Sequence, residues 1–348
     1  MTEKIVSRYH STYRAYEIGL VTRLAARGES MGFVGIAGIG KSNVVNFLRD
    51  LPQLAPQLEP DVTQLHFLTV DATQWQGQPE HLWELMLEAL IQATDSLPLP
   101  PAAKSDTSPL AENDRAMKAL HYRLRWVCQQ QQRRVMFILD DFDRVLEQGP
   151  LTMLERLSVL RGNGNRGMLS YLVLTKRLPH VLGRAHDLEH KSKFYDLFRH
   201  NIYALTPYGH DDALRMLKHL NDLAGKPLRD HQLERIFEIA GGQALLLKTV
   251  FKVWVEQGAT AQNSSEIQAG HFADNADIQH ECRRILINLH RHEQEVAYRV
   301  SHGRQRPEDE AVIDHLRQRG LIIKTEPLTW FSELMDQFLR NSGEEGSP

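Results

Sequence analysis

The segment that most constrains the fold of this chain is Gly35-Ile36-Ala37-Gly38-Ile39-Gly40-Lys41-Ser42, which fits the pattern G-x-x-x-x-G-K-[ST]. It stands between the apolar run 31–35, expected as a short buried strand, and a predicted helix from Lys41 to Leu51. Glycines let successive backbone N–H groups turn inward around a phosphate, and the following helix adds its positive N-terminal end. The sequence therefore predicts a nucleotide-binding loop that ends at Asn43. In this loop, Lys41 reaches the β- and γ-phosphates and Ser42 binds Mg²⁺.

A pair of acids follows the apolar run 135–139 (VMFIL), which predicts a buried strand. Asp140 and Asp141 would then lie at the carboxyl end of a parallel strand, in the ligand crevice of the sheet. We expect Asp140 to bind Mg²⁺ and Asp141 to position or deprotonate the attacking water. The strand at 64–70 fits the additional-strand branch of P-loop proteins, in which a strand lies between the loop strand and the acidic strand.

Apolar runs alternate with helical patterns up to residue 206, which predicts an α/β fold with a parallel sheet covered on both faces. We expect further strands at 168–174 and 201–205. Predicted helices lie at 10–27, 41–51, 79–95, 112–132, 151–160 and 190–198.

After residue 206 the pattern becomes helical. Three helical stretches near 276–290, 293–301 and 308–319, then the runs 321–324 and 328–331 and a last helix, predict a winged helix-turn-helix. The expected domains are a P-loop NTPase domain with an N-terminal helix (1–206), an all-helical lid and linker (207–268), a winged-helix domain (269–341) and a flexible tail (342–348).

Composition narrows the classes of protein. With 41 basic and 44 acidic residues, the net charge of −3 excludes a chain that coats nucleic acid along its whole length. The two cysteines, Cys128 and Cys282, can form neither a disulfide framework nor a cysteine zinc site, and predict buried thiols in a reducing cytoplasm. The sequence shows neither a long apolar run nor a signal peptide, so we expect no membrane partner and a cytoplasmic location.

Taken together, Asp140-Asp141, the strand YLVL followed by Thr175-Lys176-Arg177, the helical lid and the terminal winged helix resemble the STAND class of P-loop ATPases, the signal-transduction relatives of AAA+ proteins. The resemblance implies ATP/ADP and Mg²⁺ as cofactors and ATP hydrolysis as the reaction. It also implies that Arg177, and more weakly Thr175, senses the γ-phosphate. The lid motif Gly-x-Pro of that class falls on Gly242-Gln243-Ala244, so Gly242 and Ala244 are expected to contact the nucleotide, although Ala replaces Pro.

The resemblance implies an ATP-driven switch that hydrolyses ATP slowly and acts by self-association or through a separately encoded protein partner, in bacterial regulation or defence. The alternative is a DNA-associated AAA+ ATPase of the origin-binding or transposition-target type. A third interpretation is a kinase for a small molecule or a nucleotide. DNA binding is not favoured, because the expected third helix of the winged-helix domain carries four acids and only two arginines, Arg317 and Arg319.

Overall fold

The computed structural model describes residue 10 and residues 12–54, 64–95, 97, 115–256, 268–323 and 327–342. Most of residues 258–268, which are the small and polar linker stretch at the end of the predicted lid and linker (207–268), lies outside these ranges, as does most of the predicted tail 342–348. The described residues divide into two compact units. The first contains the residues up to Val34 and those from Lys41 to Tyr203, and the second contains Gly35–Gly40 and the residues from Ala204 onward. No helix in the described ranges has both the length and the apolar character needed to cross a bilayer.

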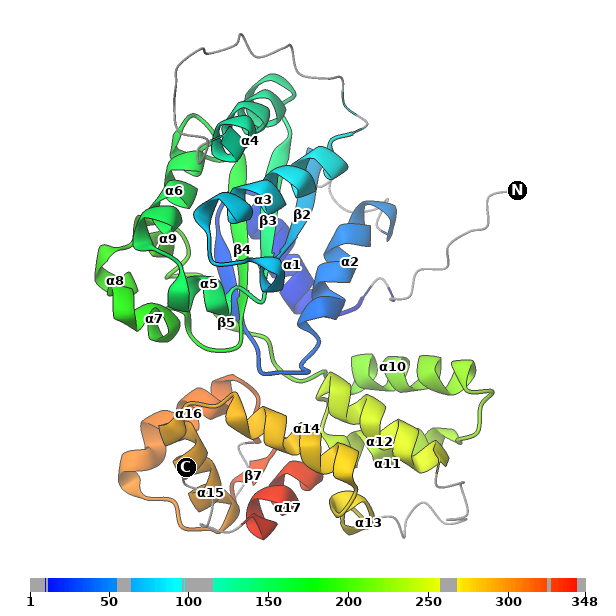
Figure 1. Ribbon diagram of the computed structural model, residues 1–348. Coiled ribbons are helices and arrows are strands. Elements are labelled where there is room, and N and C mark those ends of the chain that lie inside the picture. Colours follow the sequence, from blue (N-terminus) through cyan, green and yellow to red (C-terminus); the bar gives the residue numbers. More distant parts are fainter. Residues whose placement is uncertain are drawn as a thin grey trace. The chain divides into compact units, whose positions relative to one another are not determined.

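The first unit is built on a five-stranded sheet in the order β2-β3-β4-β1-β5, in which β1 to β4 pair in parallel (Figure 1). Strands β3 and β4 are buried along almost their whole length, which explains why their sequences are continuous apolar runs. The predicted α/β class is therefore confirmed. The bounds are Met31–Val34 for β1, Leu65–Asp71 for β2, Arg134–Asp140 for β3, Leu169–Thr175 for β4 and Ile202–Ala204 for β5.

The sheet corrects one expectation about strand order. The strand between the loop strand β1 and the acidic strand β3 is β4, whereas the run 64–70 forms β2 at the outer side of β3. An additional strand does separate the two functional strands, but the assignment of 64–70 to that position was wrong. The reason is that each parallel connection crosses over a helix, so neighbours along the chain need not be neighbours in the sheet.

Helices pack on the sheet on both of its faces, with α3 drawn in front of it and α1 behind it (Figure 1). Predicted helix 112–132, described from Arg115, ends in a π-helical turn at Trp126–Gln130, and predicted helix 190–198 is two short helices. These separate at Ser192, whose hydroxyl accepts from Tyr195 N at 3.2 Å and so begins a new turn. The helix bounds are α1 Ala15–Ala26, α2 Lys41–Leu54, α3 Pro79–Ala93, α4 Arg115–Arg125, α5 Asp143–Gln148, α6 Leu151–Gly162, α7 Pro179–Leu182, α8 Leu188–Lys191 and α9 Lys193–Asp196.

The second unit is mainly helical, with one antiparallel pair of two-residue strands. Its helices are amphipathic and bury their apolar faces against one another, as the spacing of their apolar residues predicts. Helices and strands occur where the sequence predicts them, while their assignment to a lid and a winged helix stays a prediction. The bounds are α10 His210–Leu223, α11 Asp230–Ala240, α12 Ala244–Glu256, α13 Gly270–Ala273, α14 Ala276–Ile287, α15 Arg291–Ser301, α16 Glu310–Gln318, β6 Ile322–Ile323, β7 Thr329–Trp330 and α17 Glu333–Asn341.

Candidate nucleotide-binding site

The glycine loop 35–40 has the backbone that its sequence requires. Gly38 and Gly40 have φ angles of +73° and +103°, in the left-handed region that other residues rarely adopt. A Cβ on Gly40 would also lie 2.8 Å from Oη of Tyr208. Ile36 and Ile39 are buried, which anchors the loop by its apolar side chains. The loop connects β1 directly to α2, as the motif demands.

Carboxylates gather where β2 and β3 end. Asp71 and Asp140, the last residues of these strands, are partners in the parallel register. Val34 at the end of β1 is likewise the partner of Thr175 at the end of β4. The carboxyl edge of the sheet therefore carries the predicted acidic pair together with the strand end that precedes the glycine loop.

Lys41 lies in this first unit within electrostatic range of three carboxylates, one at the end of β3 and two just after it. It is 8% exposed, and burial lowers the pKa of its ammonium group, while the charges of Asp141, Asp143 and Asp140 act in the opposite direction. Burial and the neighbouring charge of Asp141 raise the pKa of Asp140 to about 6, against the influence of Lys41. Burial also raises the pKa of Asp143. The cluster thus concentrates negative charge that Lys41 alone does not neutralise.

The residues present fit a magnesium-bound nucleotide. Among the described residues, Oδ2 of Asp143 and Oγ1 of Thr175 are buried without a hydrogen-bond partner, so they have capacity for further ligands. No group of three or more His, Cys, Asp or Glu side chains in the described ranges could hold a metal by itself. Mg²⁺ is commonly bound by one or two carboxylates together with substrate phosphates and waters, which agrees with this arrangement. Ser42, the other predicted metal ligand, is exposed in the first turn of α2.

Of the residues after β4, it is Lys176 that contacts the predicted acidic pair. Arg177, expected to sense the γ-phosphate, is exposed, and its role stays a prediction. Its neighbour Lys176 instead places Nζ 3.2 Å from Oδ1 of Asp141 and donates its backbone N–H to Oδ1 of Asp143 at 2.9 Å. Sequence reasoning missed Lys176 because the motif of the family selects the third residue of Thr-Lys-Arg, while the turn after β4 presents the second.

Of the two residues of the predicted lid motif, Ala244 lies against the glycine loop within the second unit, while Gly242 packs on Tyr208. Ala244 Cβ is 3.6 Å from the position that a Cβ on Gly40 would take. Between them, Gln243 donates from Nε2 to the carbonyl of Ala37 at 2.8 Å, and it is fully buried. Sequence reasoning missed Gln243, although an amide at the start of the apolar run ALLLKTVFKVWV is a signal that it has a specific partner.

Comparison with known proteins shows the fold of the chain. No protein-family description matches it, and no curated protein matches it. Among solved structures, the Walker-type ATPase PABY2304 of Pyrococcus abyssi is similar over 96% of this chain and 99% of its own, with a TM-score of 0.59 and 12% identity. The chain shares the fold of a Walker-type ATPase.

The same fold occurs in the ORC2 protein of Aeropyrum pernix. In its ADPNP–ADP complexes, the ORC2 protein of Aeropyrum pernix matches over 97% of both chains, with a TM-score of 0.52 and 14% identity. In its ADP form it matches over 98% of this chain and 97% of its own, with a TM-score of 0.53 and 12% identity. At 12–14% identity these similarities show the fold alone and do not single out the STAND class.

Proposed function

We propose that the protein binds ATP with Mg²⁺ and hydrolyses it to ADP and phosphate. The observation that carries this proposal is the buried Lys41, which directly follows a left-handed glycine loop and lies among Asp140, Asp141 and Asp143. Bound phosphates would neutralise the charge of Lys41, and a bound metal ion would neutralise the charges of the acids. The ATPase and ADP-bound structures with the same fold support the proposal.

Each residue has a separate task. Backbone N–H groups of the loop residues 35–43 and the ammonium group of Lys41 would bind the phosphates, and Gly242 and Ala244 would adjoin the nucleotide. Ser42 and Asp140 would hold Mg²⁺, which supplies positive charge to the phosphate oxygens. Asp141 would orient or deprotonate the attacking water.

Calorimetric titration with ATP in the presence of Mg²⁺ tests this assignment. Lys41→Ala removes the charge that faces the phosphates and should abolish measurable binding. Arg49→Ala is a matched control, because Arg49 is an exposed cation on the same helix α2. Equal affinity of Lys41→Ala and wild type would show that the loop does not bind nucleotide.

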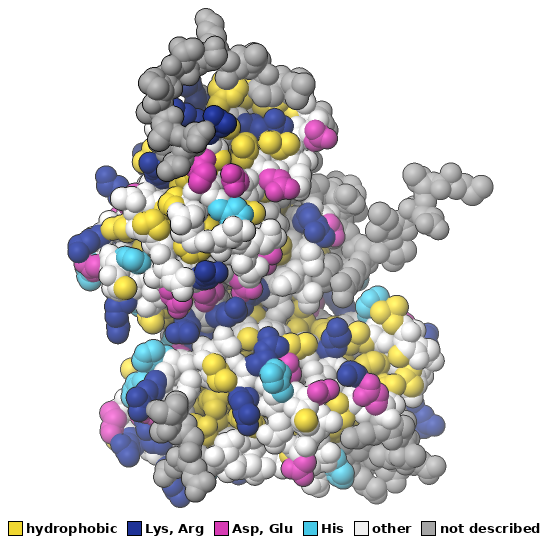
Figure 2. Space-filling model, viewed as in Figure 1, with side chains coloured by type: hydrophobic (Ala, Val, Ile, Leu, Met, Phe, Trp, Pro, Cys, Tyr) yellow, Lys and Arg dark blue, Asp and Glu magenta, His cyan; other side chains and the backbone are white. Residues whose placement is uncertain are grey.

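A second candidate function is that of a DNA-associated AAA+ ATPase, and the fold similarity to ORC2 favours it over a STAND switch. In such a protein, the question is whether arginines at α16, the third helix of the predicted winged helix, are available to contact DNA. Arg319 is buried and pairs with Glu293 at 2.9 Å, and Arg317 is in an ion pair with Asp314 of its own helix. On the face shown in Figure 2, basic and acidic side chains are interspersed. We therefore propose that DNA, if it is bound, is contacted by residues outside α16.

Anisotropy titrations of duplex DNA with ATP at about 0.15 M salt separate the two candidates. Tight binding that weakens steeply with salt would establish the DNA-associated function. Arg317→Glu should leave that binding unchanged, because its guanidinium group already pairs with Asp314. Absence of DNA binding, with nucleotide-dependent self-association or partner binding in sedimentation experiments, would establish the switch.

A further inference from the structure

The first turn of α12 is hydrogen-bonded to two successive carbonyls of the glycine loop. Gln243 Nε2 donates to Ala37 O at 2.8 Å, and Leu245 N donates to Gly38 O at 3.0 Å. Oε1 of Gln243 also accepts from Leu246 N, so both ends of the buried amide are occupied. The start of a helix leaves backbone N–H groups that need acceptors, and here the loop supplies one of them. The loop and the start of α12 therefore depend on each other for their hydrogen bonds.

These bonds use the groups of the loop that a nucleotide does not need. Phosphate is bound by the N–H groups of such a loop, which leaves its carbonyls to other partners. Gly38 is also packed tightly, since a Cβ there would overlap Nε2 of Gln243. A change of the loop on phosphate binding would consequently displace Gln243 or break its bond to Ala37.

The two residues before Gln243, Gly241 and Gly242, pack against backbone atoms of other segments of the second unit. Gly241 has a φ of +68°, and a Cβ there would overlap the carbonyl oxygen of Phe331. Gly242 has a φ of +84°, accepts from Tyr208 N at 2.8 Å, and would overlap the carbonyl of Tyr208 if it carried a Cβ. Backbone packs directly on backbone at both glycines, so this connector has little room to move without moving its neighbours.

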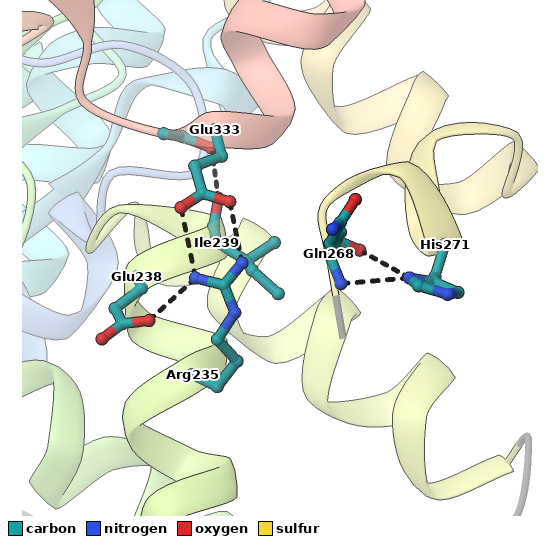
Figure 3. Close-up of polar contacts among 7 residues, drawn as sticks. Arg235, Glu238, Ile239, Gln268, His271 and Glu333 are labelled. Atoms are coloured by element: carbon teal, nitrogen blue, oxygen red, sulfur yellow. Dashed lines mark hydrogen bonds and ion pairs between the residues drawn. The ribbon is translucent and has the colours of Figure 1, made fainter. Parts of the chain in front are cut away.

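Phe331 directly precedes Ser332 and Glu333, which connect the start of α17 to α11 through hydrogen bonds. Ser332 Oγ donates to Ile239 O at 2.9 Å, and Arg235 donates to both carboxylate oxygens of Glu333 at 3.1 and 3.2 Å (Figure 3). Arg235 also donates to Glu238 on its own helix, which holds the guanidinium group in place. The N-terminus of α17 is therefore fixed to the same segment that carries Gln243.

We propose that Gln243 is a positioning residue that transmits the conformation of the glycine loop to helix α17 through the connector Gly241-Gly242. The proposal rests on the proposed function, since the nucleotide is what changes the loop. It identifies the route by which nucleotide binding regulates the C-terminal part of the chain. A partner or DNA bound by that part would sense the nucleotide through α17.

Gln243→Glu is the sharpest variant for testing this route. It keeps the length of the side chain and the acceptor for Leu246 N, but it removes the donor to Ala37 O and places two acceptors against each other. Gln232→Glu is the matched control. Gln232 is also buried in this unit, and its Oε1 accepts from Arg229 N at 2.8 Å without contacting the loop. If Gln243→Glu does not fold, Gln243→Met, which is neutral and of similar length, replaces it.

Hydrogen exchange of the full chain, followed at Leu245 and along α17, is the measurement. Without nucleotide, Gln243→Glu should speed exchange at Leu245 and in α17 by about threefold or more, and Gln232→Glu should not alter α17. On addition of ATP and Mg²⁺, wild type should change its exchange in α17, and Gln243→Glu should bind ATP but lose that change.

The two proposals fail in different ways. If calorimetry shows ATP binding but α17 of wild type does not respond, the transmission route is wrong and the proposed function stands. If wild type does not bind ATP, the proposed function is wrong, and the nucleotide-free comparison alone decides on the route. Faster exchange at Leu245 with unchanged exchange in α17 would also overturn the route.

Discussion

Nζ of Lys176 lies 3.2 Å from Oδ1 of Asp141, the carboxylate proposed to act on the attacking water. A cation in this place can orient the carboxylate and stabilise charge on a transferred phosphate. We expect Lys176→Met, which keeps most of the aliphatic stem, to lower ATP turnover by about tenfold or more while ATP affinity changes little. Steady-state hydrolysis together with calorimetry measures the two effects.

Arg177→Met is the control for this experiment, because Arg177 is the neighbouring cation and is exposed. It should retain turnover close to that of wild type. Loss of turnover in Arg177→Met, with none in Lys176→Met, would support Arg177 as the sensor and reject Lys176.

Asp141→Asn should separate binding from hydrolysis. Asp141 has a φ of +49°, a conformation in which Asp and Asn are both tolerated, so the substitution preserves the backbone. Removal of the base should lower turnover by about 10²-fold or more and leave ATP bound. Single-turnover hydrolysis of bound ATP is the readout, and a rate equal to that of wild type would exclude Asp141 from the chemical step.

Asp140→Asn should stabilise the nucleotide-free protein at neutral pH, whereas Asp71→Asn should destabilise it. Asp140 is crowded by Asp141 and desolvated, so its charge is unfavourable in the absence of Mg²⁺. Asp71, its register partner, accepts from Thr73 N, Thr73 Oγ1 and Gln74 Nε2, and these bonds outweigh burial and lower its pKa. Opposite shifts in Tm would confirm the difference, and a loss of stability in both variants would contradict it.

We expect the protein to lose stability in acid, because protonation of Glu293 removes a stabilising contribution. Burial alone would raise its pKa, but the hydrogen bond with His315, the charge of Arg319 and the N–H of His290 lower it to about 2. The pKa in the folded state is thus below the ordinary value of 4.5, so the stabilisation is complete above that value and is lost as the pH falls toward 2. The shift corresponds to at most about 3 kcal/mol in the free energy of unfolding.

Denaturant unfolding of Glu293→Gln across this pH range checks the expectation. The variant should be less stable at neutral pH and should show a smaller loss of stability in acid than wild type. Glu295→Gln, on the exposed side of the same helix α15, is the control. A pH dependence of Glu293→Gln identical to that of wild type would show that Glu293 does not contribute in this way.

The parts of the fold that the sequence predicts well are those fixed by local patterns. Buried parallel strands such as β3 and β4 are uniformly apolar, and the loop from Gly35 to Ser42 carries its own backbone requirements. Strand order is not local, because it depends on how each crossover returns to the sheet, and the place of β4 between β1 and β3 was assigned to the wrong segment.

The candidate site follows from the sequence only in part, for a similar reason. Lys41, Asp140 and Asp141 follow from the motif and from their place at a strand end. The nearness of Lys176 to Asp141 depends on a turn that is held by the bond between Lys176 N and Asp143, which no spacing rule reveals. Gln243 and Ala37 are 206 positions apart in the sequence, and only the folded structure brings these residues together.

The glycine loop is a short piece of the second unit inserted into the sequence of the first. Its neighbours include Leu205, Tyr208 and Gln243, all of which lie at or after the start of the second unit. A fragment that ends before Leu205 would contain the whole G-x-x-x-x-G-K-[ST] motif but none of these three neighbours of the loop. The glycine loop and the helical C-terminal part are consequently not independent modules. An exchange of the C-terminal part for that of another protein would have to recreate the packing around the loop.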